Sequence, residues 1–363
     1  MIALALSGGG SRAIAFHLGC LRALNDTGVL ERVSVISAVS GGSVIAALFA
    51  YRNLSFDDFD EAVRRLLRAG LQQAALRHLL SPGLLARVAA TNLVSRPLAA
   101  AASLFGREAP FRRWASRTDA LERALVDQFG DVELSQLPRA ELDMVFNACE
   151  LRTGTAFRFG NRKSGNWRFG EVKGNKVSLA HAVACSAAYP MLLPAMDREY
   201  TFQKGTETRL DRVIITDGGV YDNLGITCIE PGRDERYSLH AYRPDYIICC
   251  HAGYGQFSGK KIPFSFYSRV ATSFESVFRK AQDAAVNRLH MYVQTGRIRG
   301  FILPYLGQQD RSLPIELPDL VTREAIIGYP TDFAAMTNEI ISRLATRGEQ
   351  LTRILLRHYC PEI

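Results

Sequence analysis

Residues 2–12 of this 363-residue chain read IALALSGGGSR, and their pattern indicates the architecture. Ile2–Leu6 is an apolar run of strand length, Gly8–Gly10 form a glycine loop, and a helical pattern of apolar residues follows. Strand and helix then alternate again, because Val33–Ser37 predicts a second strand and Gly42–Ala50 a second helix. This β-α-β-α start predicts a parallel sheet with helices packed on it.

Later segments continue the α/β pattern. Short apolar runs predict further strands at Leu142–Leu151, Thr155–Phe159, Val213–Thr216, Tyr246–Cys250 and Phe301–Tyr305. Helical spacing predicts helices at Leu179–Ala188, Pro263–Met291 and Thr331–Tyr359. The sequence shows neither an internal repeat nor a low-complexity linker. We therefore expect a single domain over residues 1–363, with a helical insertion or lid at about 53–135 and a helical C-terminal part at about 260–363.

The composition is that of a globular protein. Hydrophobic residues make up 47% of the chain and charged residues 22%, which supports a large core and excludes a disordered or fibrous class. The charge-free run Val33–Tyr51 is long enough to cross a membrane, but its serines and glycines favour a buried strand, a turn and a buried helix. The first residues lack the basic and cleavage features of a signal peptide, so we expect a cytoplasmic protein.

Metal binding is not expected from the residues that could provide ligands. The seven cysteines are scattered through apolar segments without C-x-x-C spacing, which favours reduced core residues over a metal or disulfide framework. Asp57, Asp58, Asp60 and Glu61 resemble a calcium site. Their place in the first turn of a helix capped by Ser55 explains them better, because carboxylates there favour the helix dipole. We expect metal-independent catalysis without a cofactor.

Positive charge is concentrated in the predicted insertion. The net charge is +8, and residues 62–107 hold no acidic residue but seven arginines, which are Arg64, Arg65, Arg68, Arg77, Arg87, Arg96 and Arg107. Such a segment suits an anionic surface. Nucleic acid is the rival partner, but neither a zinc pattern nor an aromatic RNA-binding signature accompanies the charge. We therefore expect the protein to be peripheral at an anionic membrane and to bind no nucleic acid.

Three glycine-bearing corners follow predicted strands, and the second has the shape of a nucleophile elbow. Residues 38–42 read AVSGG, a tight strand-to-helix turn that would lift the Ser40 hydroxyl out of the sheet. Ala38 stands where this motif usually has glycine. The third corner, Asp217–Gly219, places a carboxyl group after another strand. Since ligands bind at the carboxyl ends of strands in open parallel sheets, we expect all three corners to face one crevice.

The first corner, Ser7–Arg12, presents consecutive backbone N–H groups at the start of a helix. In an acyl hydrolase such a cradle is an oxyanion hole, where each donor is worth about 3–4 kcal/mol. Dinucleotide binding is the alternative, because Gly8-x-Gly10 after a strand matches part of the Rossmann fingerprint. The second strand, however, ends at Ser37–Ser40 without the acidic residue that would hold a ribose, and a P-loop is excluded because its Gly-Lys-Ser/Thr end is missing.

Taken in this order, the three corners resemble those of the patatin-like phospholipase family. Ala184–Pro190 and Val220–Gly225 strengthen the resemblance, which covers residues 1–52 and 140–255. It implies a three-layer α/β/α fold with a central, mostly parallel sheet, and hydrolysis of acyl esters in membrane phospholipids or other glycerolipids. It also implies a Ser-Asp dyad without histidine, with Ser40 as nucleophile and Asp217 as base. The implied oxyanion hole is Gly8, Gly9 and Gly10 with Arg12 held close by, and the supporting motif positions are Ala38, Gly41, Gly42, Gly218 and Gly219.

The proposed dyad makes a demand on Asp217. A carboxylate is a poor base at its ordinary pKa of about 4, so Asp217 must be desolvated and its pKa raised. A triad is the mechanistic alternative, because His251 follows the Tyr246–Cys250 strand and gives the chain order Ser, Asp, His of α/β-hydrolases. A non-catalytic lipid- or nucleotide-binding module is a further alternative, which intact Ser40 and Asp217 disfavour. The sequence therefore predicts a serine-dependent lipid acyl hydrolase.

Overall fold

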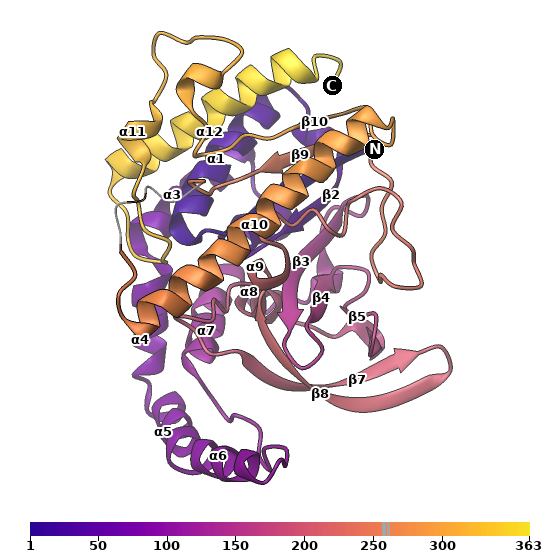
Figure 1. The fold of residues 1–363 in the computed structure, drawn as a ribbon, viewed down its shortest axis with the longest axis vertical. Coiled ribbons are helices and arrows are strands. Elements are labelled where there is room, and N and C mark those ends of the chain that lie inside the picture. Colours follow the sequence, from indigo (N-terminus) through magenta and orange to yellow (C-terminus); the bar gives the residue numbers. More distant parts are fainter. Residues whose placement is uncertain (256–258, 260–261) are drawn as a thin grey trace.

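A ten-stranded sheet forms the centre of the computed structural model, which describes residues 1–255, 259 and 262–363 (Figure 1). Its spatial order is β10-β9-β1-β2-β3-β4-β5-β6-β7-β8. The strands are β1 Ile2–Leu6, β2 Val33–Ala38, β3 Asp143–Glu150, β4 Thr155–Gly160, β5 Gly165–Asn166, β6 Gly170–Val172, β7 Met196–Lys204, β8 Glu207–Asp217, β9 Tyr246–Cys250 and β10 Gly300–Ile302.

The sheet is mixed. From β10 to β3, neighbouring strands run parallel, as the β-α-β-α start indicates. From β3 onward the pairings are antiparallel, and β8 returns to pair with the far end of β3. The α/β class is confirmed, but the sheet contains more antiparallel pairing than the sequence suggests. The β7–β8 hairpin accounts for much of the difference, because β7 and the first half of β8 are polar and have no apolar run that would reveal them.

The helices follow the predicted pattern closely, and Val33–Tyr51 forms β2, a turn and α2 as expected. The helices are α1 Gly10–Asp26, α2 Gly41–Tyr51, α3 Phe56–Ala69, α4 Leu71–Leu79, α5 Pro82–Ala90, α6 Arg96–Leu104, α7 Arg117–Phe129, α8 Leu179–Ser186, α9 Gly219–Asp222, α10 Phe266–Gln294, α11 Arg323–Ile326 and α12 Asn338–Tyr359. Short 3-10 or π segments lie at Leu30–Arg32, Thr91–Ser95, Leu134–Gln136, Lys173–Asn175 and Asp310–Ser312. Residues 260–261 of the predicted C-terminal part lie outside the described residues.

Helices cover both faces of the sheet, which confirms the three-layer arrangement. Successive strand residues point to opposite faces. Leu4 and Leu6 of β1 therefore pack in one core with α1, α2, α8 and α12, whereas Ala3 and Ala5 pack in a second core with α10. Figure 1 shows α10 crossing one face of the sheet, with α1 and α12 beyond it. The two cores hold the strand ends that carry the glycine corners from both sides.

Helix α1, which begins at the glycine loop, makes its most extensive contact with α12. The two backbones approach closely, since a methyl group added at Gly19 would overlap the backbone of Ala345, and one added at Gly348 would overlap the backbone of Phe16. Only glycine allows this approach. Helix α12 therefore fixes the position of α1 and, through it, of the loop at its N-terminus.

The insertion predicted at about residues 53–135 is helical but not uniform. Helix α3 packs into the core, because Phe59 and Val63 are buried. Ser55 caps this helix as expected, since its side chain accepts a hydrogen bond from the Asp58 N–H at 3.2 Å. Helices α5 and α6 form an arm that projects from the rest of the molecule (Figure 1), and no side chain of α6 is buried. In the described part of the chain, no helix has the length and apolar character that crossing a membrane requires.

Candidate active site

Ser40 lies in a sharp turn between β2 and α2. Its backbone angles, φ 52° and ψ −119°, fall in a region that glycine favours and other residues rarely adopt. The following residues must be small, because a methyl group added at Gly41 would overlap the Gly10 backbone and one at Gly42 would overlap the backbone at the end of β1. Ala38 is fully buried at the end of β2, so alanine fits the position where the motif usually has glycine.

A buried hydrogen-bond network holds this turn. The Ser186 hydroxyl accepts from the Ser40 N–H at 3.0 Å, donates to the Asn147 carbonyl oxygen at 2.6 Å and lies 2.8 Å from the Ser43 hydroxyl. The Asn147 side chain in turn donates to the Ala38 carbonyl oxygen at 3.0 Å. Sequence reasoning missed the roles of Ser186 and Asn147, since their partners lie far away along the chain. The only signal was the place of Ser186 in the small-residue helix α8.

Asp217 approaches Ser40 along a strand that runs the opposite way. β3 continues past the end of β2, because Ala38 pairs with Phe146 whereas Asp217 pairs with Ala148, two residues further on. β8 is antiparallel to β3, so its last residue arrives close to the end of β2 although the strands point in opposite directions. The argument from carboxyl ends of parallel strands is therefore wrong for the third corner. The corner nevertheless lines the same cavity as the other two.

The Asp217 carboxyl group is buried and poorly solvated. Its Oδ1 accepts a hydrogen bond from the Gly219 N–H at 2.6 Å, whereas Oδ2 is buried and has no hydrogen-bond partner among the described residues. Burial raises the pKa of Asp217 to about 7, against the lowering effects of the Gly219 N–H and the Ser40 hydroxyl. Ser40 thus lies close enough to influence the carboxyl group, although no hydrogen bond of ordinary geometry joins their side chains.

The glycine loop offers fewer free donors than the sequence indicates. The Gly8 N–H donates to the Asn223 carbonyl oxygen at 3.1 Å, so this group is already occupied. Within the described residues, no acceptor is hydrogen-bonded to the N–H groups of Gly9 and Gly10, and both residues line the same cavity as Ser40. They open α1, whose N-terminus favours negative charge. Sequence reasoning named the segment around Asn223 but missed this contact.

Arg12 connects the glycine loop to later parts of the chain. Its Nε donates to the Ala252 carbonyl oxygen at 2.9 Å and its Nη1 to the Tyr329 carbonyl oxygen at 3.1 Å. The guanidinium group also lies 4.3 Å from the centre of the Tyr254 ring. Arg12 is therefore close to the loop, as the resemblance implies, but two of its nitrogens are engaged with backbone oxygens. This arrangement positions the loop.

His251, the third residue of the alternative triad, also lines the cavity. Its ring stacks on Tyr305 with the centroids 4.6 Å apart, and burial lowers its pKa to about 4, so the ring is neutral at pH 7. Neither Ser40 nor Asp217 is hydrogen-bonded to it in the part of the chain that the structure describes. The geometry therefore favours the dyad over the Ser40, Asp217 and His251 triad.

These groups line a cavity of about 1080 Å³. Asn223 also belongs to the polar part of its wall. Most of the remaining wall is apolar and comes from α4, α7, α10 and a late loop, through residues that include Leu76, Leu79, Leu121, Phe274, Phe278 and Phe333. A largely apolar cavity that also contains a buried hydroxyl and carboxyl group can hold a hydrocarbon chain beside a reacting ester.

The sequence model of the patatin-like phospholipase family matches residues 4–227, which is more than half of the chain. The chain belongs to the patatin-like phospholipase family. The match includes all three glycine corners up to Gly219. No curated protein matches the sequence.

Solved structures support the fold of this patatin-like protein. It is similar to human GIVD cytosolic phospholipase A2 in complex with methyl γ-linolenyl fluorophosphonate, with a TM-score of 0.54 and 12% identity over 98% of this chain and 57% of that one. The same human enzyme with this inhibitor and terbium chloride gives a TM-score of 0.52, also at 12% identity, with the same two coverages. VipD from Legionella pneumophila gives a TM-score of 0.40 and 13% identity, over 99% of this chain and 67% of that one. The chain thus spans little more than half the length of the human enzyme.

Replacing Ser186 with alanine should disturb the elbow, because it leaves the buried Ser40 N–H without an acceptor. We expect a loss of about 1–3 kcal/mol in the free energy of unfolding and a fall of about tenfold or more in kcat on a soluble ester, since small shifts of a nucleophile are costly. Chemical denaturation and steady-state kinetics measure the two effects. Ser43→Ala loses only its bond to Ser186 and should keep most activity, whereas unchanged stability and kcat in Ser186→Ala would contradict the role.

Proposed function

We propose that this protein is a serine-dependent lipid acyl hydrolase in which Ser40 is the nucleophile and Asp217 the base. The observation that carries the proposal is the raised pKa of the buried Asp217 carboxyl group close to the strained Ser40 turn. A carboxyl group with a pKa of about 7 exchanges protons readily at neutral pH, so it can serve as base and acid in turn. No histidine is needed for this chemistry.

The proposed reaction proceeds through an acyl-enzyme. Ser40 Oγ attacks the ester carbonyl carbon as its proton passes to Asp217, and the N–H groups of Gly9 and Gly10 stabilise the oxyanion that forms. Collapse of this intermediate breaks the bond to the alcohol, which takes the proton from Asp217. Water then attacks the acyl-enzyme, again giving a proton to Asp217, and the fatty acid leaves as Ser40 regains its hydrogen. Neither a metal nor a cofactor takes part in these steps.

The apolar cavity supports a lipid substrate. A cavity of about 1080 Å³ exceeds the volume that a short-chain ester fills, and its wall of leucine and phenylalanine side chains matches a fatty acyl chain. The substrate class that we propose is membrane phospholipid or another glycerolipid. Helices α4 and α7 of the insertion line the cavity, so a lid role for this part of the chain stays a proposal, as does the single domain over residues 1–363.

The insertion's arginines are less available to a membrane than the sequence suggests. Arg64 pairs with Asp60 at 2.9 Å and Arg68 pairs with Glu61, so acidic residues at the start of α3 neutralise two of the seven. Asp60 and Glu61, candidates for a calcium site, are instead engaged in these ion pairs. Five other arginines of residues 62–107 remain as the basic part of the proposed membrane contact.

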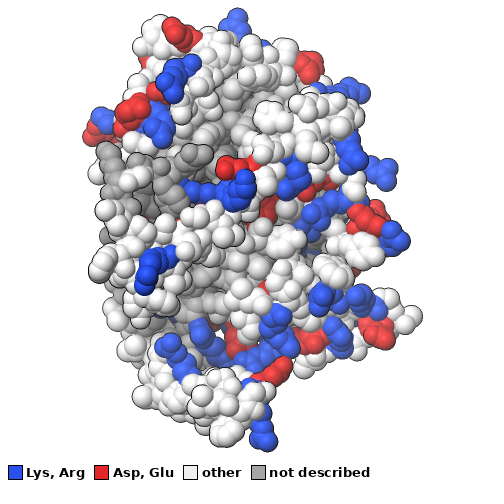
Figure 2. Space-filling model, viewed as in Figure 1, with Lys and Arg blue, Asp and Glu red and all other residues white. Residues whose placement is uncertain are grey.

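The first half of α10 adds an apolar surface next to the cavity. Phe274 and Phe278 line the cavity, while Tyr267 is 84% exposed and Phe266 and Val270 are also exposed. Figure 2 shows few charged side chains over this end of α10, whereas Lys and Arg gather near the α5–α6 arm and the β7–β8 hairpin. We propose that this surface inserts shallowly into the bilayer from which the cavity takes its substrate, with the basic residues at the lipid headgroups.

Ser40→Ala should abolish both hydrolysis and covalent labelling. A fluorophosphonate probe should label the parent chain at Ser40, and kcat on a soluble ester should fall by about 10⁴-fold or more in the variant, because no other hydroxyl replaces the nucleophile. Mass spectrometry locates the label. Ser43→Ala, three residues away, should remain labelled at Ser40. Labelling of Ser40→Ala at the parent rate would refute the assignment. If the assignment holds, lipid profiling with the active parent chain defines the substrate.

The pH dependence of activity should report Asp217. Because the base must be ionised, kcat/KM on a soluble ester should fall below an apparent pKa of about 7 and be about 100-fold below its plateau at pH 5. Activity that stays level down to pH 4 would exclude a raised carboxyl group as the base.

The same pKa shift predicts a gain of stability in Asp217→Asn. The folded pKa lies above the unfolded value, so the contribution of Asp217 to stability is complete below pH 4 and is lost as the pH rises through about 7. Removing the charge should therefore raise the free energy of unfolding above pH 7, by up to about 4 kcal/mol, but not below pH 4. Denaturation at both pH values measures the difference in the inactive variant.

Phe266→Ser combined with Tyr267→Ser should weaken binding to lipid vesicles by about tenfold or more. Each aromatic ring removed takes about 1 kcal/mol or more from the free energy of binding, because its apolar surface is no longer buried in the bilayer. Vesicle co-sedimentation with and without anionic lipid, at low and high salt, measures the binding. Activity on a soluble ester should be retained. Tyr359→Ser removes a similarly exposed ring from α12 and should bind normally. Binding that ignores the α10 changes would end the proposal for this helix, and indifference to anionic lipid and salt would end it for the arginines.

A further inference from the structure

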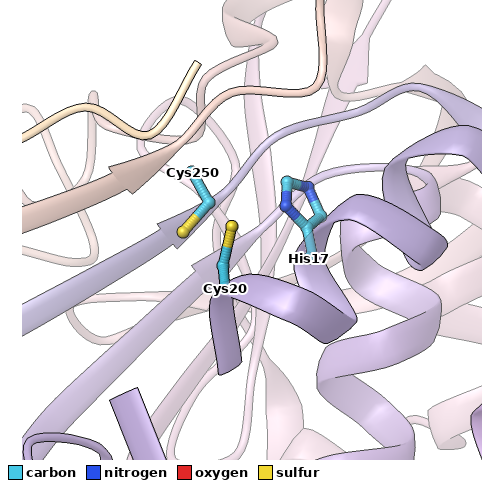
Figure 3. Close-up of side chains that lie close together, drawn as sticks. All are labelled: His17, Cys20 and Cys250. Carbon is cyan, nitrogen blue, oxygen red and sulfur yellow. The ribbon is translucent and has the colours of Figure 1, made fainter. Parts of the chain in front are cut away.

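Three potential metal ligands converge behind the glycine loop. His17 and Cys20 lie one turn apart on α1, and Cys250 is the last residue of β9 (Figure 3). Their ligand atoms all lie within 4.8 Å of one another, and the three side chains are completely buried. Among the described residues, this is the only such group of three or more histidine, cysteine, aspartate or glutamate side chains.

The hydrogen bonding of His17 leaves one ring nitrogen facing the sulfurs. Its Nε2 lies 3.0 Å from the Ser7 carbonyl oxygen, which can only accept, so Nε2 carries the hydrogen. Nδ1 then holds a lone pair, is buried, and has no partner among the described residues. Figure 3 shows the imidazole ring lying beside Cys20 with Cys250 across from it. A histidine that donates one N–H to a backbone carbonyl is oriented as metal-ligating histidines usually are.

We propose that His17 Nδ1, Cys20 Sγ and Cys250 Sγ bind a thiophilic cation, Zn²⁺ or Cu⁺. Two cysteine sulfurs and an imidazole nitrogen are the donors that such ions prefer. Binding releases the two thiol protons to solvent, and the charge of Zn²⁺ balances that of the two thiolates. The ion would also give the unpaired Nδ1 a partner. The sequence disfavours a metal because its cysteines lack C-x-x-C spacing, and only folding brings Cys250 to α1.

The proposed ion would be structural. It would tie α1 to the end of β9. Ser7 already contacts both, because its carbonyl oxygen lies 3.0 Å from His17 Nε2 and its N–H donates to the Cys250 carbonyl oxygen at 3.1 Å. Ser7 Oγ also accepts from the Ala252 N–H at 2.9 Å. Ser7 immediately precedes the glycine loop, so an ion at this place would restrain the loop without contacting substrate. The proposal for the ion does not depend on the proposed function.

Metal analysis of the full-length chain tests this site. Protein purified under reducing, anaerobic conditions and loaded separately with Zn²⁺ and with Cu⁺ should retain one ion per chain after desalting. Cys20→Ala and Cys250→Ala should lose it. Cys249→Ala is the matched control, because Cys249 is the preceding residue, is equally buried and packs in the core on the other face of the sheet. Loading with Co²⁺ should give a thiolate charge-transfer band in the parent chain and in this control only.

The parent chain also decides the question by itself if the variants do not fold. Its thermal midpoint should rise on adding the retained ion and fall on adding a chelator. A folded, reduced parent chain that retains neither ion would overturn the proposal, as would full retention by folded Cys20→Ala or Cys250→Ala. Retention of Cu⁺ but not Zn²⁺ would keep the site and assign it to the monovalent ion. Ser40 labelling in the same samples tests the proposed function separately.

Discussion

The close contact between Gly41 and the backbone of Gly10 is the constraint on which the site depends. It brings the N-termini of α1 and α2 together, so that the turn carrying Ser40 and the free N–H groups of the glycine loop line one cavity. A side chain at Gly41 would force the two loops apart, and the hydrogen bond between Ser40 and Ser186 would be displaced with them. Backbone packing therefore determines the position of the Ser40 hydroxyl group in the cavity.

Burial determines the electrostatics of Asp217. An arginine or lysine beside the carboxyl group would lower its pKa and make it a weaker base, whereas full exposure to water would return the pKa to its ordinary range. In the described structure Asp217 instead receives one N–H, from Gly219, and leaves Oδ2 without a partner. The pKa of Asp217 is raised because one hydrogen bond compensates only partly for the loss of water around the carboxylate. Burying this group lowers the free energy of unfolding, and the packing of the two cores on either side of the sheet must offset that loss.

Local patterns in the sequence predicted the parallel half of the fold and the place of Ser40. The strands β1, β2 and β9 are short, mostly apolar and soon followed by glycine, so strand, turn and helix could be placed within a few residues. The antiparallel half was harder, because β7 reads MDREYTFQK and has mixed burial without a clean alternation. The direction of β8, and with it the true reason why Asp217 meets Ser40, depends on pairing with β3 and has no local signal. The Ser186 hydroxyl contacts partners that are 39 and 146 residues away along the chain, Asn147 and Ser40. Local sequence patterns carry no information about contacts at such separations.

Helix α1 combines the requirements of the two sites. Gly9 and Gly10, at its N-terminus, line the cavity, while His17 and Cys20, two to three turns on by helix geometry, lie close to Cys250. Because the helix is rigid and its contact with α12 at Gly19 allows no side chain, a restraint at the cysteine end also fixes the loop end. An ion held there would act only through position, since Ser7 and its backbone lie between the sulfurs and the glycine loop. The proposed metal-free ester hydrolysis and the proposed structural ion are thus compatible in one protein, because each uses a different end of the same helix.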